Sequence, residues 1–350
     1  MNSINTLHSG DKQPIKLSIC IPTYNRAMYL RETLNCIISQ CDESIEIVVS
    51  DNGSNDNTSE VIADAKNKFK NITYHQWDVN QGADKNYLKT VELAQGEYCW
   101  FFGSDDAIKD LAIDRILNEI NSRCDIYLCS EYLCDLQLKP YSIHYLLPQN
   151  IKDTKFNLSD PKQLLDYFNL AQSHSALFGY LSCIIFKREK WNSITYNDEY
   201  TGTLYSHMFM LYSFIEKGCV LQYIQDPLVY WRSGNDSFGG AGNIQKRYLI
   251  DIDGFTKIKN EFFIDNIEIA NAFKGAFRRH HPYKNLAYLR LNVGKKQDWY
   301  SIEDKLVNDF GYNRLILSTI RSEASKIGLK LLFLAYRVQM KISRMIIKLE

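Results

Sequence analysis

EYCWFFGSDD, residues 97–106, is the stretch of the chain from which the fold can be read. Its apolar run, residues 98–102, predicts a buried strand, which ends at Gly103 before two adjacent acids, Asp105 and Asp106. In open α/β sheets, ligands bind at the carboxyl ends of the strands. Two carboxylates at that place predict a hard oxygen site for Mg²⁺ or Mn²⁺, which usually also binds phosphate oxygens of a substrate.

The same acids have a second interpretation. A Ser or Asp side chain before a helical segment at 107–120 is typical of a helix N-cap, which stabilises the first turn of the helix. The loops that follow the other predicted strands favour the ligand site.

The composition is that of a globular protein. The chain has 350 residues, of which 45% are hydrophobic and 23% charged, enough for one large or two ordinary domains. Its 41 basic and 41 acidic residues leave no net charge, which argues against nucleic acid as a partner. The 9 cysteines include no CxxC pair, and Cys124, Cys129 and Cys134 fit no common zinc spacing, so we interpret the cysteines as reduced, buried thiols.

Neither targeting nor membrane-spanning signals are predicted. Residues 1–14 are polar, predict a disordered lead, and lack the apolar core of a signal peptide. No apolar run approaches the ~20 residues of a transmembrane helix. We therefore expect a cytoplasmic protein that is attached at most peripherally to a membrane.

Strands and helices alternate through the first third of the chain. Apolar runs predict strands at 17–21, 45–49, 72–74 and 98–102, and the segments between them have helical periodicity. This alternation predicts a mostly parallel sheet flanked by helices, with the loops after the strands at one edge. No GxGxxG follows the first strand and no Walker GxxxxGK[ST] occurs, so a phosphate must be held in another way.

Four polar motifs follow these strands in order: PTYNR at 22–26, DNGSND at 51–56, NQG at 80–82 and SDD at 104–106. Over roughly residues 16–110 they resemble the signatures of family 2 glycosyltransferases with the GT-A fold. The resemblance implies a Rossmann-like α/β sheet, a nucleotide-sugar donor, a divalent metal, Mn²⁺ or Mg²⁺, and an inverting transfer. Ser104 departs from the family pattern, which often has Asp there.

The resemblance also implies roles for single residues. Asp106 would ligate the metal, Asp105 would lie near both ribose and metal, and Asp51 would accept a hydrogen bond from the base. Residues that would line the nucleotide site are Pro22, Thr23, Asn25, Arg26, Asp51, Asn52, Asp84, Lys85, Ser104 and Asp105. Asn52-Gly53 is also a common turn signal, but its position on the edge that carries the acids favours function.

The remainder of the first 240 residues is less regular. The sequence predicts strands at 125–133, 182–186 and 223–231, a helix at 161–171, and an irregular segment at 135–160. A polar turn, NDEYTGT at 197–203, precedes a helix that contains His207. The resembled family takes its catalytic base from about this region, which makes Asp198, Glu199 and His207 candidates. Helix-start acids and a packing histidine are the structural alternatives.

Arg232 begins RSGNDSFGG, residues 232–240, a loop rich in Gly and Ser that can form a mobile lid over a donor. The planar guanidinium of Arg232 is suited to a diphosphate, and a plain surface loop is the alternative. This loop, with YTGT at 200–203 and His207, is similar to the O-antigen branch of abequosyltransferase-like enzymes.

The C-terminal region is predicted to be helical from Gln245 onward. Its last stretch, 311–350, has eight basic and two acidic residues, a net charge of +6, among many apolar ones. A basic amphipathic helix of this kind can bind an anionic membrane surface, or it can pack on the protein with a solvated basic face. Because the acceptors of the resembled enzymes are usually lipid-linked, we expect peripheral attachment to the inner face of the cytoplasmic membrane.

The expected organisation is a disordered lead at 1–14, a GT-A domain at 15–240 and a helical region at 241–350. Within the GT-A domain, 15–110 would bind the nucleotide and 111–240 the acceptor. The expected function is transfer of a hexosyl or deoxyhexosyl group to a hydroxyl of a lipid-linked oligosaccharide, in the synthesis of O-antigen or another surface polysaccharide.

Two other functions were weighed against this one. A sugar-phosphate nucleotidyltransferase needs a Gly-rich, basic loop after the first strand, which 22–26 does not provide. The alternative from another class is a catalytically silent nucleotide- or carbohydrate-binding scaffold of a membrane assembly complex. The intact Asp105-Asp106 pair argues against that alternative.

Overall fold

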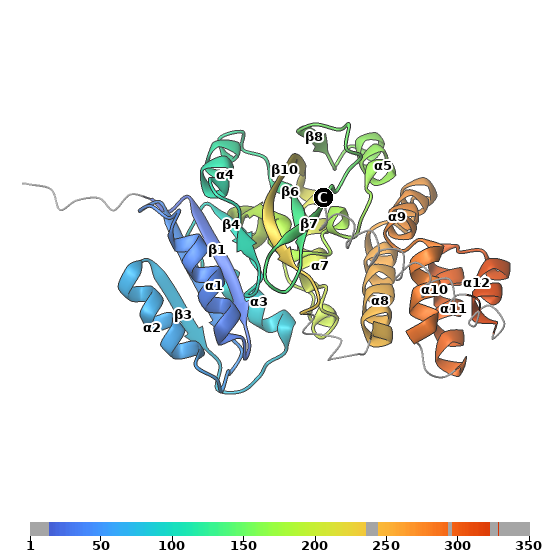
Figure 1. Ribbon diagram of the computed structural model, residues 1–350. Coiled ribbons are helices and arrows are strands. Elements are labelled where there is room, and N and C mark those ends of the chain that lie inside the picture. Colours follow the sequence, from blue (N-terminus) through green and yellow to red (C-terminus); the bar gives the residue numbers. More distant parts are fainter. Residues whose placement is uncertain (1–13, 236–243, 293–295, 323–327, 329–350) are drawn as a thin grey trace, which may run out of the picture. The chain divides into compact units, whose positions relative to one another are not determined.

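The computed structural model describes residues 14–235, 244–292, 296–322 and 328 (Figure 1). The chain divides into two compact units, the first of residues 1–160 and 178–234, the second of residues 161–177 and 235–350. The predicted disordered lead and most of the predicted membrane segment lie outside the described residues, as do residues 236–240 of the predicted lid.

The first unit is built on one ten-stranded sheet. Its strand order is β3-β2-β1-β4-β9-β6-β10-β5, with β7 paired to β6 and β8 paired to β10. The strands are β1 (Leu17–Thr23), β2 (Ile45–Asp51), β3 (Ile72–Gln76), β4 (Tyr98–Phe101), β5 (Ala107–Ile108), β6 (Ile126–Cys134), β7 (Pro140–His144), β8 (Thr154–Asn157), β9 (Ile184–Lys187) and β10 (Val220–Arg232).

The first four strands are parallel, as the alternating pattern predicted. They are joined by α1 (Ala27–Ile38), α2 (Thr58–Lys68) and α3 (Ala83–Leu93). Right-handed crossovers place α3, whose connection returns past β1, on the opposite face of the sheet from α1 and α2. Both faces are thereby covered, which explains why β1, β2 and β4 are apolar and buried along almost their whole length. The predicted GT-A type architecture is confirmed.

Two local predictions were wrong. The segment 107–120 begins as strand β5, and α4 (Ala112–Ile120) starts only at Ala112 after Leu111 in the left-handed conformation. The interpretation of Ser104 to Asp106 as a helix N-cap therefore fails. The segment 135–160, predicted to be irregular, contains β7 and β8, which pair antiparallel with longer strands. β7 is mostly exposed, so it carries no apolar pattern from which to predict it.

A buried carboxylate joins the strands at the end of the sheet opposite the acids. Glu46, 1% exposed, accepts hydrogen bonds at Oε1 from the Ser18 hydroxyl (2.5 Å) and from the backbone N–H groups of Gln95 and Gly96 (2.5 and 3.2 Å). The Gly96 N–H also lies 2.8 Å from Ser18 Oγ. A Cβ atom at Gly96 would lie 2.5 Å from Ser18 Oγ, so the close approach of this turn requires glycine.

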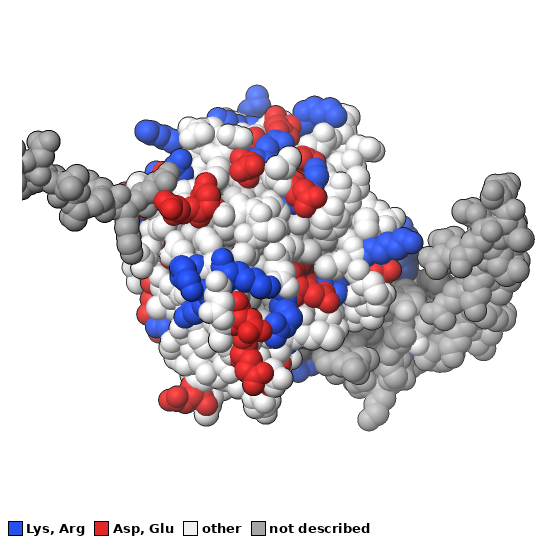
Figure 2. Space-filling view, turned by 60° about the vertical axis from the view of Figure 1, so that its left-hand side comes forward, with Lys and Arg blue, Asp and Glu red and all other residues white. Residues whose placement is uncertain are grey.

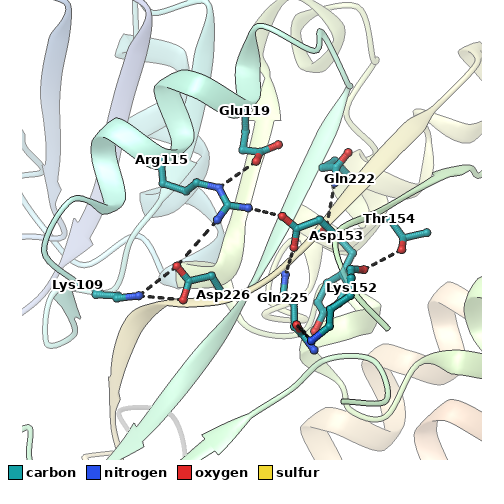
Figure 3. A network of polar contacts seen from close by, with 10 residues as sticks. Lys109, Arg115, Glu119, Lys152, Asp153, Thr154, Gln222, Gln225 and Asp226 are labelled. Carbon is teal, nitrogen blue, oxygen red and sulfur yellow. Dashed lines mark hydrogen bonds and ion pairs between the residues drawn. The ribbon is translucent and has the colours of Figure 1, made fainter. Parts of the chain in front are cut away.

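A second polar network, drawn in Figure 3, ties α4 to an irregular part of β10. Lys109 Nζ lies 2.8 Å from Asp226 Oδ1, and Arg115 contacts Glu119, Asp153 and Asp226. The register of β10 against β6 shifts on both sides of Pro227, where a strand proline cannot donate to the ladder. The side chains are partly exposed, so we assign the network to alignment of these elements rather than to large stabilisation.

The second unit is helical in its described part. It contains α5 (Pro161–Leu170), α8 (Ile244–Phe262), α9 (Ile267–His280), α10 (Tyr283–Asn292), α11 (Lys296–Phe310) and α12 (Arg314–Arg321). Phenylalanines fill its core, and the rings of Phe277 and Phe310 stack with centroids 3.7 Å apart. Residues 161–177, expected in the GT-A domain, group with this unit because Phe168 of α5 packs on Phe273 of α9 at 5.3 Å. Among the described residues, no helix combines the length and apolarity needed to cross a bilayer.

The Glu46 network generates a prediction for stability. Glu46→Ala removes the acceptor of the Ser18 hydroxyl and of the Gln95 N–H, and leaves the Gly96 N–H with Ser18 Oγ alone. The change is expected to lower the free energy of unfolding by about 3 kcal/mol, measured by urea denaturation. Glu43→Ala, an exposed residue three positions earlier, is the matched control and is expected to have no measurable effect. Equal stability of the two variants would show that the network contributes nothing.

Candidate active site

The loops that follow β1, β2, β3 and β4 meet at one edge of the sheet, as predicted. The first two loops are locked to each other by backbone-to-side-chain hydrogen bonds. The Asn25 N–H donates to Ser54 Oγ (2.8 Å), and the Asn55 N–H donates to Asn25 Oδ1 (2.9 Å). Asn25 has φ of 51°, a left-handed conformation that Asn tolerates better than most residues. The Ala27 N–H at the start of α1 donates to Asp56 Oδ2 (2.9 Å).

Asp51, the predicted base-binding residue, is buried at the end of β2. Its Oδ1 accepts the Ser54 N–H (2.9 Å) and its Oδ2 accepts the Tyr74 hydroxyl (2.8 Å). Burial of Tyr74 and its hydrogen bond to this carboxylate raise the pKa of Tyr74, which keeps the phenol protonated and able to donate. Tyr74 was not singled out in the sequence, because only its place in β3 next to β2 reveals the contact.

Asn52 links the second loop to the third. Its Nδ2 donates to Asn80 Oδ1 (3.0 Å) and to the Gly82 carbonyl (3.2 Å), and its Oδ1 accepts the Gln81 N–H (2.8 Å). Next to it, Gly53 has φ of 77°, and a Cβ there would lie 3.1 Å from backbone atoms of the third loop. Asn52 is therefore held by protein groups, and its shown role is to shape the edge.

The predicted metal-binding acids lie directly after β4. Asp105 Oδ2 forms an ion pair with Arg26 Nη1 at 2.6 Å. Asp106, 2% exposed, accepts hydrogen bonds at Oδ2 from the hydroxyls of Tyr180 and Ser182, both at 2.6 Å. Neither Tyr180 nor Ser182 was predicted, because they precede β9, far from the acids in sequence and adjacent to them in the sheet.

Arg232 completes this cluster from the end of β10. Its backbone N–H donates to Asp106 Oδ1 (3.1 Å), and its Nε donates to the Asp105 carbonyl (2.7 Å). Its Nη2 pairs with Glu32 at 2.5 Å, and the guanidinium lies 4.8 Å from the centre of the Tyr29 ring. Arg232 is 4% exposed, and its guanidinium contacts Glu32 and the Asp105 carbonyl. Its predicted pairing with a diphosphate stays a prediction.

The surroundings of Asp106 favour the protonated form of its carboxyl group. Burial, together with the adjacent Asp105 carboxylate, raises the pKa of Asp106 to about 7, although three hydrogen bonds oppose the shift. A divalent cation would favour the charged form, and carboxylate oxygens are the ligands that Mg²⁺ and Mn²⁺ prefer. Within the described ranges, no group of three His, Cys, Asp or Glu side chains forms a metal site. The carboxylate oxygens of Asp105 and Asp106 fit such a cation by their chemistry.

Asp84 has a different role from the predicted nucleotide contact. It is 2% exposed, and its carboxylate accepts the N–H groups of Gly202 (2.7 Å) and Leu204 (2.9 Å) and the Ser206 hydroxyl (2.5 Å). The Tyr87 hydroxyl also donates to it. These donors occupy both oxygens, so Asp84 anchors the 202–206 loop to the start of α3. The next residue, Lys85, is exposed.

The three candidate bases lie close together in sequence but in different environments. Asp198 and Glu199 are exposed in a 3₁₀ turn, with the Glu199 N–H capped by the Asn197 side chain at 3.0 Å. His207, in α7 (Ser206–Tyr212), is 2% exposed, and its Nε2 lies 2.7 Å from the Phe178 carbonyl oxygen. Its ring packs edge-on against Tyr87 at 5.5 Å. The environment of His207 is that of a packed histidine.

The remaining predicted residues differ in exposure. Pro22 is partly exposed, and Ser104 is 5% exposed. Thr23, at the end of β1, is 3% exposed, and its Oγ1 has no hydrogen-bond partner among the described residues. A buried hydroxyl without a protein partner is uncommon.

Comparison with known proteins identifies the class to which this site belongs. A family model described as glycosyl transferase family 2 matches residues 18–190. Abequosyltransferase RfbV of Salmonella typhimurium strain LT2 is 37% identical over 313 residues, which are 87% of this chain and 92% of that protein. The chain therefore belongs to glycosyltransferase family 2 and is a glycosyltransferase.

Other relatives and solved structures agree at the level of the fold. The GalNAc(5)-diNAcBac-PP-undecaprenol beta-1,3-glucosyltransferase of Campylobacter jejuni is 30% identical over 30% of this chain and 35% of its own. S. aureus TarS 1–349 in complex with UDP has a TM-score of 0.58 at 16% identity, over 88% of this chain and 91% of that one. Mannosyltransferase PcManGT from Pyrobaculum calidifontis, in complex with GDP-Man and Mn²⁺, has a TM-score of 0.50 at 15% identity. The match covers 92% of this chain and 89% of that one.

The contacts of Asp84 generate a prediction that separates anchoring from nucleotide binding. Asp84→Asn is expected to speed amide hydrogen exchange at Gly202 and Leu204 by at least about tenfold, because each N–H loses a charged acceptor. Asp198→Asn, in the same segment but exposed, serves as the control and is expected to leave exchange at these amides unchanged. Unaltered exchange in the Asp84 variant would contradict the anchoring role.

Proposed function

We propose that the protein transfers a hexosyl or deoxyhexosyl group from a nucleotide-sugar donor to a hydroxyl of a lipid-linked oligosaccharide, in the synthesis of O-antigen or a related surface polysaccharide. The observation that carries this proposal is the Asp105-Asp106 pair, which lies where α/β sheets bind ligands and in which burial and the adjacent carboxylate raise the pKa of Asp106. Similarity over nearly the whole chain to an abequosyltransferase supports a sugar of the deoxyhexose class.

The donor is proposed to lie over the loops that follow β1 and β2. The TarS structures contain UDP and UDP-GlcNAc, which supports a nucleotide sugar as the donor. Pro22, Thr23 and Asn25 would contact the nucleotide, and the Thr23 hydroxyl lacks the partner that a ligand can supply. Asp51 would accept the N–H of the base, with its orientation set by Tyr74 and Ser54. A buried acceptor of this kind discriminates against bases without a matching donor.

A divalent cation, Mn²⁺ or Mg²⁺, is proposed to bind Asp106, with Asp105 beside it. When bound, it would neutralise the negative charge that develops on the departing nucleoside diphosphate. The chain's own contribution is to orient the ligand oxygens: Tyr180 and Ser182 fix one oxygen of Asp106, and the Arg232 N–H fixes the other. Arg26 holds Asp105 in the same way.

The reaction is proposed to be a single displacement with inversion at the anomeric carbon. The acceptor hydroxyl oxygen forms a bond to that carbon while the bond from the carbon to the phosphate oxygen breaks. The proton of the hydroxyl passes to a general base, and the nucleoside diphosphate leaves with the bonding electrons. Asp198 and Glu199 are exposed and suited to this role, whereas His207 is enclosed by Tyr87 and the Phe178 carbonyl.

The protein is proposed to act at the cytoplasmic face of the membrane, bound through its basic C-terminal stretch. The structure indicates where the chain can be truncated to test this contact. Leu317 and Ile320 of α12 are buried, and Tyr312 before them is 3% exposed, so a cut before residue 311 would expose core. A cut after Ser322 keeps these buried residues of α12 and removes residues 323–350, which include six basic and two acidic residues.

The donor and metal assignments share one test. Thermal shifts with UDP, GDP, CDP and dTDP, each with and without Mn²⁺, are expected to give one nucleotide that stabilises the protein only with the metal. Asp106→Asn is expected to abolish this shift and to reduce turnover by at least about a hundredfold, while Asp64→Asn, an exposed surface residue, changes neither. Near-normal turnover of Asp106→Asn would overturn the metal assignment.

The membrane proposal predicts that a chain ending at Ser322 no longer sediments with anionic vesicles. Each Lys or Arg near an anionic bilayer contributes on the order of 1 kcal/mol, so high salt is expected to weaken binding of the full chain. The shortened chain must keep its circular dichroism spectrum and nucleotide-dependent thermal shift. If it remains on vesicles as well as the full chain does, residues 323–350 do not form the membrane contact.

A further inference from the structure

The second unit contains a pocket of about 790 Å³. It is lined by Gln172, Gly275, Arg278, Arg279, Pro282, Tyr283, Gly311, Tyr312 and Asn313. All of these residues belong to the helical unit, so the pocket is a property of that unit alone. Its only charged lining residues are the two arginines, which gives it a positive charge.

Both arginines also bond to the carboxyl ends of neighbouring helices. Arg279 donates through Nε and Nη2 to the carbonyls of Ala171 and Phe168 at the end of α5. Arg278 donates through Nη1 to the Phe310 carbonyl, at 2.5 Å, at the end of α11. Cations at helix carboxyl ends are favourable, so capping accounts for part of each side chain. It does not account for the remaining donors.

A guanidinium has five N–H donors, and these caps leave several unused. The described residues provide no acceptor for Nη1 of Arg279 or for Nε and Nη2 of Arg278. No carboxylate within the described ranges forms an ion pair with either arginine. Burial, together with the neighbouring charge of Arg278, lowers the pKa of Arg279. Two like charges therefore lie close together without an anion between them.

The unused ends of the two guanidinium groups converge over Gly275. A Cβ atom at this glycine would lie 3.4 Å from Arg279 Nη1 and 3.9 Å from Arg278 Nη2. Glycine inside a helix such as α9 costs about 1 kcal/mol relative to alanine. Here it leaves open the space between the two donors.

We propose that this pocket is a binding site for a phosphate or diphosphate group, held between Arg278 and Arg279 above Gly275. Planar guanidinium groups bind phosphate oxygens through paired N–H donors, and two of them together match the charge of a diphosphate. The Tyr283 hydroxyl accepts the Asn313 N–H (2.9 Å) and retains its own hydrogen for donation. The rings of Tyr283 and Tyr312, 5.5 Å apart and edge-on, give the site an aromatic wall.

This site is independent of the proposed donor site, because none of its residues belongs to the sheet unit. The test is titration of the full-length protein with inorganic pyrophosphate by calorimetry, in buffer without divalent cations. Arg278→Gln is expected to weaken binding by at least about tenfold, since it removes a charged donor pair. Lys274→Gln, which removes the same charge from the same helix outside the pocket, is the matched control and is expected to bind as the unchanged protein does.

Gly275→Ala separates loss of the site from loss of the fold. The added methyl group occupies the point between the guanidinium groups, while alanine favours the helix, so binding is expected to fall without a decrease in melting temperature. Absence of saturable binding to the unchanged protein would overturn the proposal. So would equal binding by Arg278→Gln, Gly275→Ala and Lys274→Gln, because the anion would then bind elsewhere.

The source of the phosphate is identified by a second ligand. Farnesyl diphosphate that binds more tightly than inorganic pyrophosphate, with the same loss in Arg278→Gln, supports a lipid diphosphate as the natural occupant. Equal affinities support a soluble phosphate compound in the same site. Farnesyl diphosphate binding that survives both Arg278→Gln and Gly275→Ala would contradict a phosphate contact at the two arginines.

Discussion

The carboxylates of Asp105 and Asp106 lie side by side at the end of β4, where they are largely shielded from water. Desolvation of these charges costs free energy, and several elements of the sheet unit supply the groups that offset it. Desolvation alone would drive one of them to the neutral form. Three hydrogen bonds to Asp106, from β10 and from the segment before β9, act against this. They come from strands that are distant in sequence, so the acids hold together the two halves of the sheet as well as forming a ligand site. The positive charges of Arg26 and Arg232 complete the arrangement.

The polar loops at this edge are ordered by one another. Asn25, Ser54 and Asn55 join the first loop to the second, and Asn52 joins the second to the third. The side chains of Asn25, Ser54 and Asn52 satisfy backbone groups that a loop would otherwise leave to water. The surface between the strands is therefore preorganised before any donor arrives, which reduces the ordering that binding must impose. Figure 2 shows that, over the face drawn, basic and acidic side chains lie next to one another, in keeping with the absence of net charge.

The parts of the fold and of the site that have a local sequence pattern could be predicted, and the parts that depend on tertiary contacts could not. The buried strands β1, β2 and β4 are mostly apolar, and the loops after them carry polar motifs in order, so both the parallel sheet and the edge were predicted. Tyr180, Ser182 and Tyr74 were not, because an isolated hydroxyl has no local pattern and acquires its meaning only from strand order. The family resemblance implies a nucleotide contact for Asp84, whereas its hydrogen bonds run to residues 202–206. β7 and the affiliation of α5 with α9 depend on tertiary pairing that periodicity does not encode.

The irregular register of β10 has a consequence for how this chain can vary. β10 leaves the ion-pair network at Asp226, passes the shifts around Pro227 and ends at Arg232, whose backbone and side chain both contact the acids. Successive side chains of a strand point to opposite faces, so one residue gained or lost after Pro227 would turn Trp231 or Ser233 toward Asp106 and Arg232 away. The number of residues between Pro227 and Arg232 is therefore fixed by the contacts at both ends of this segment.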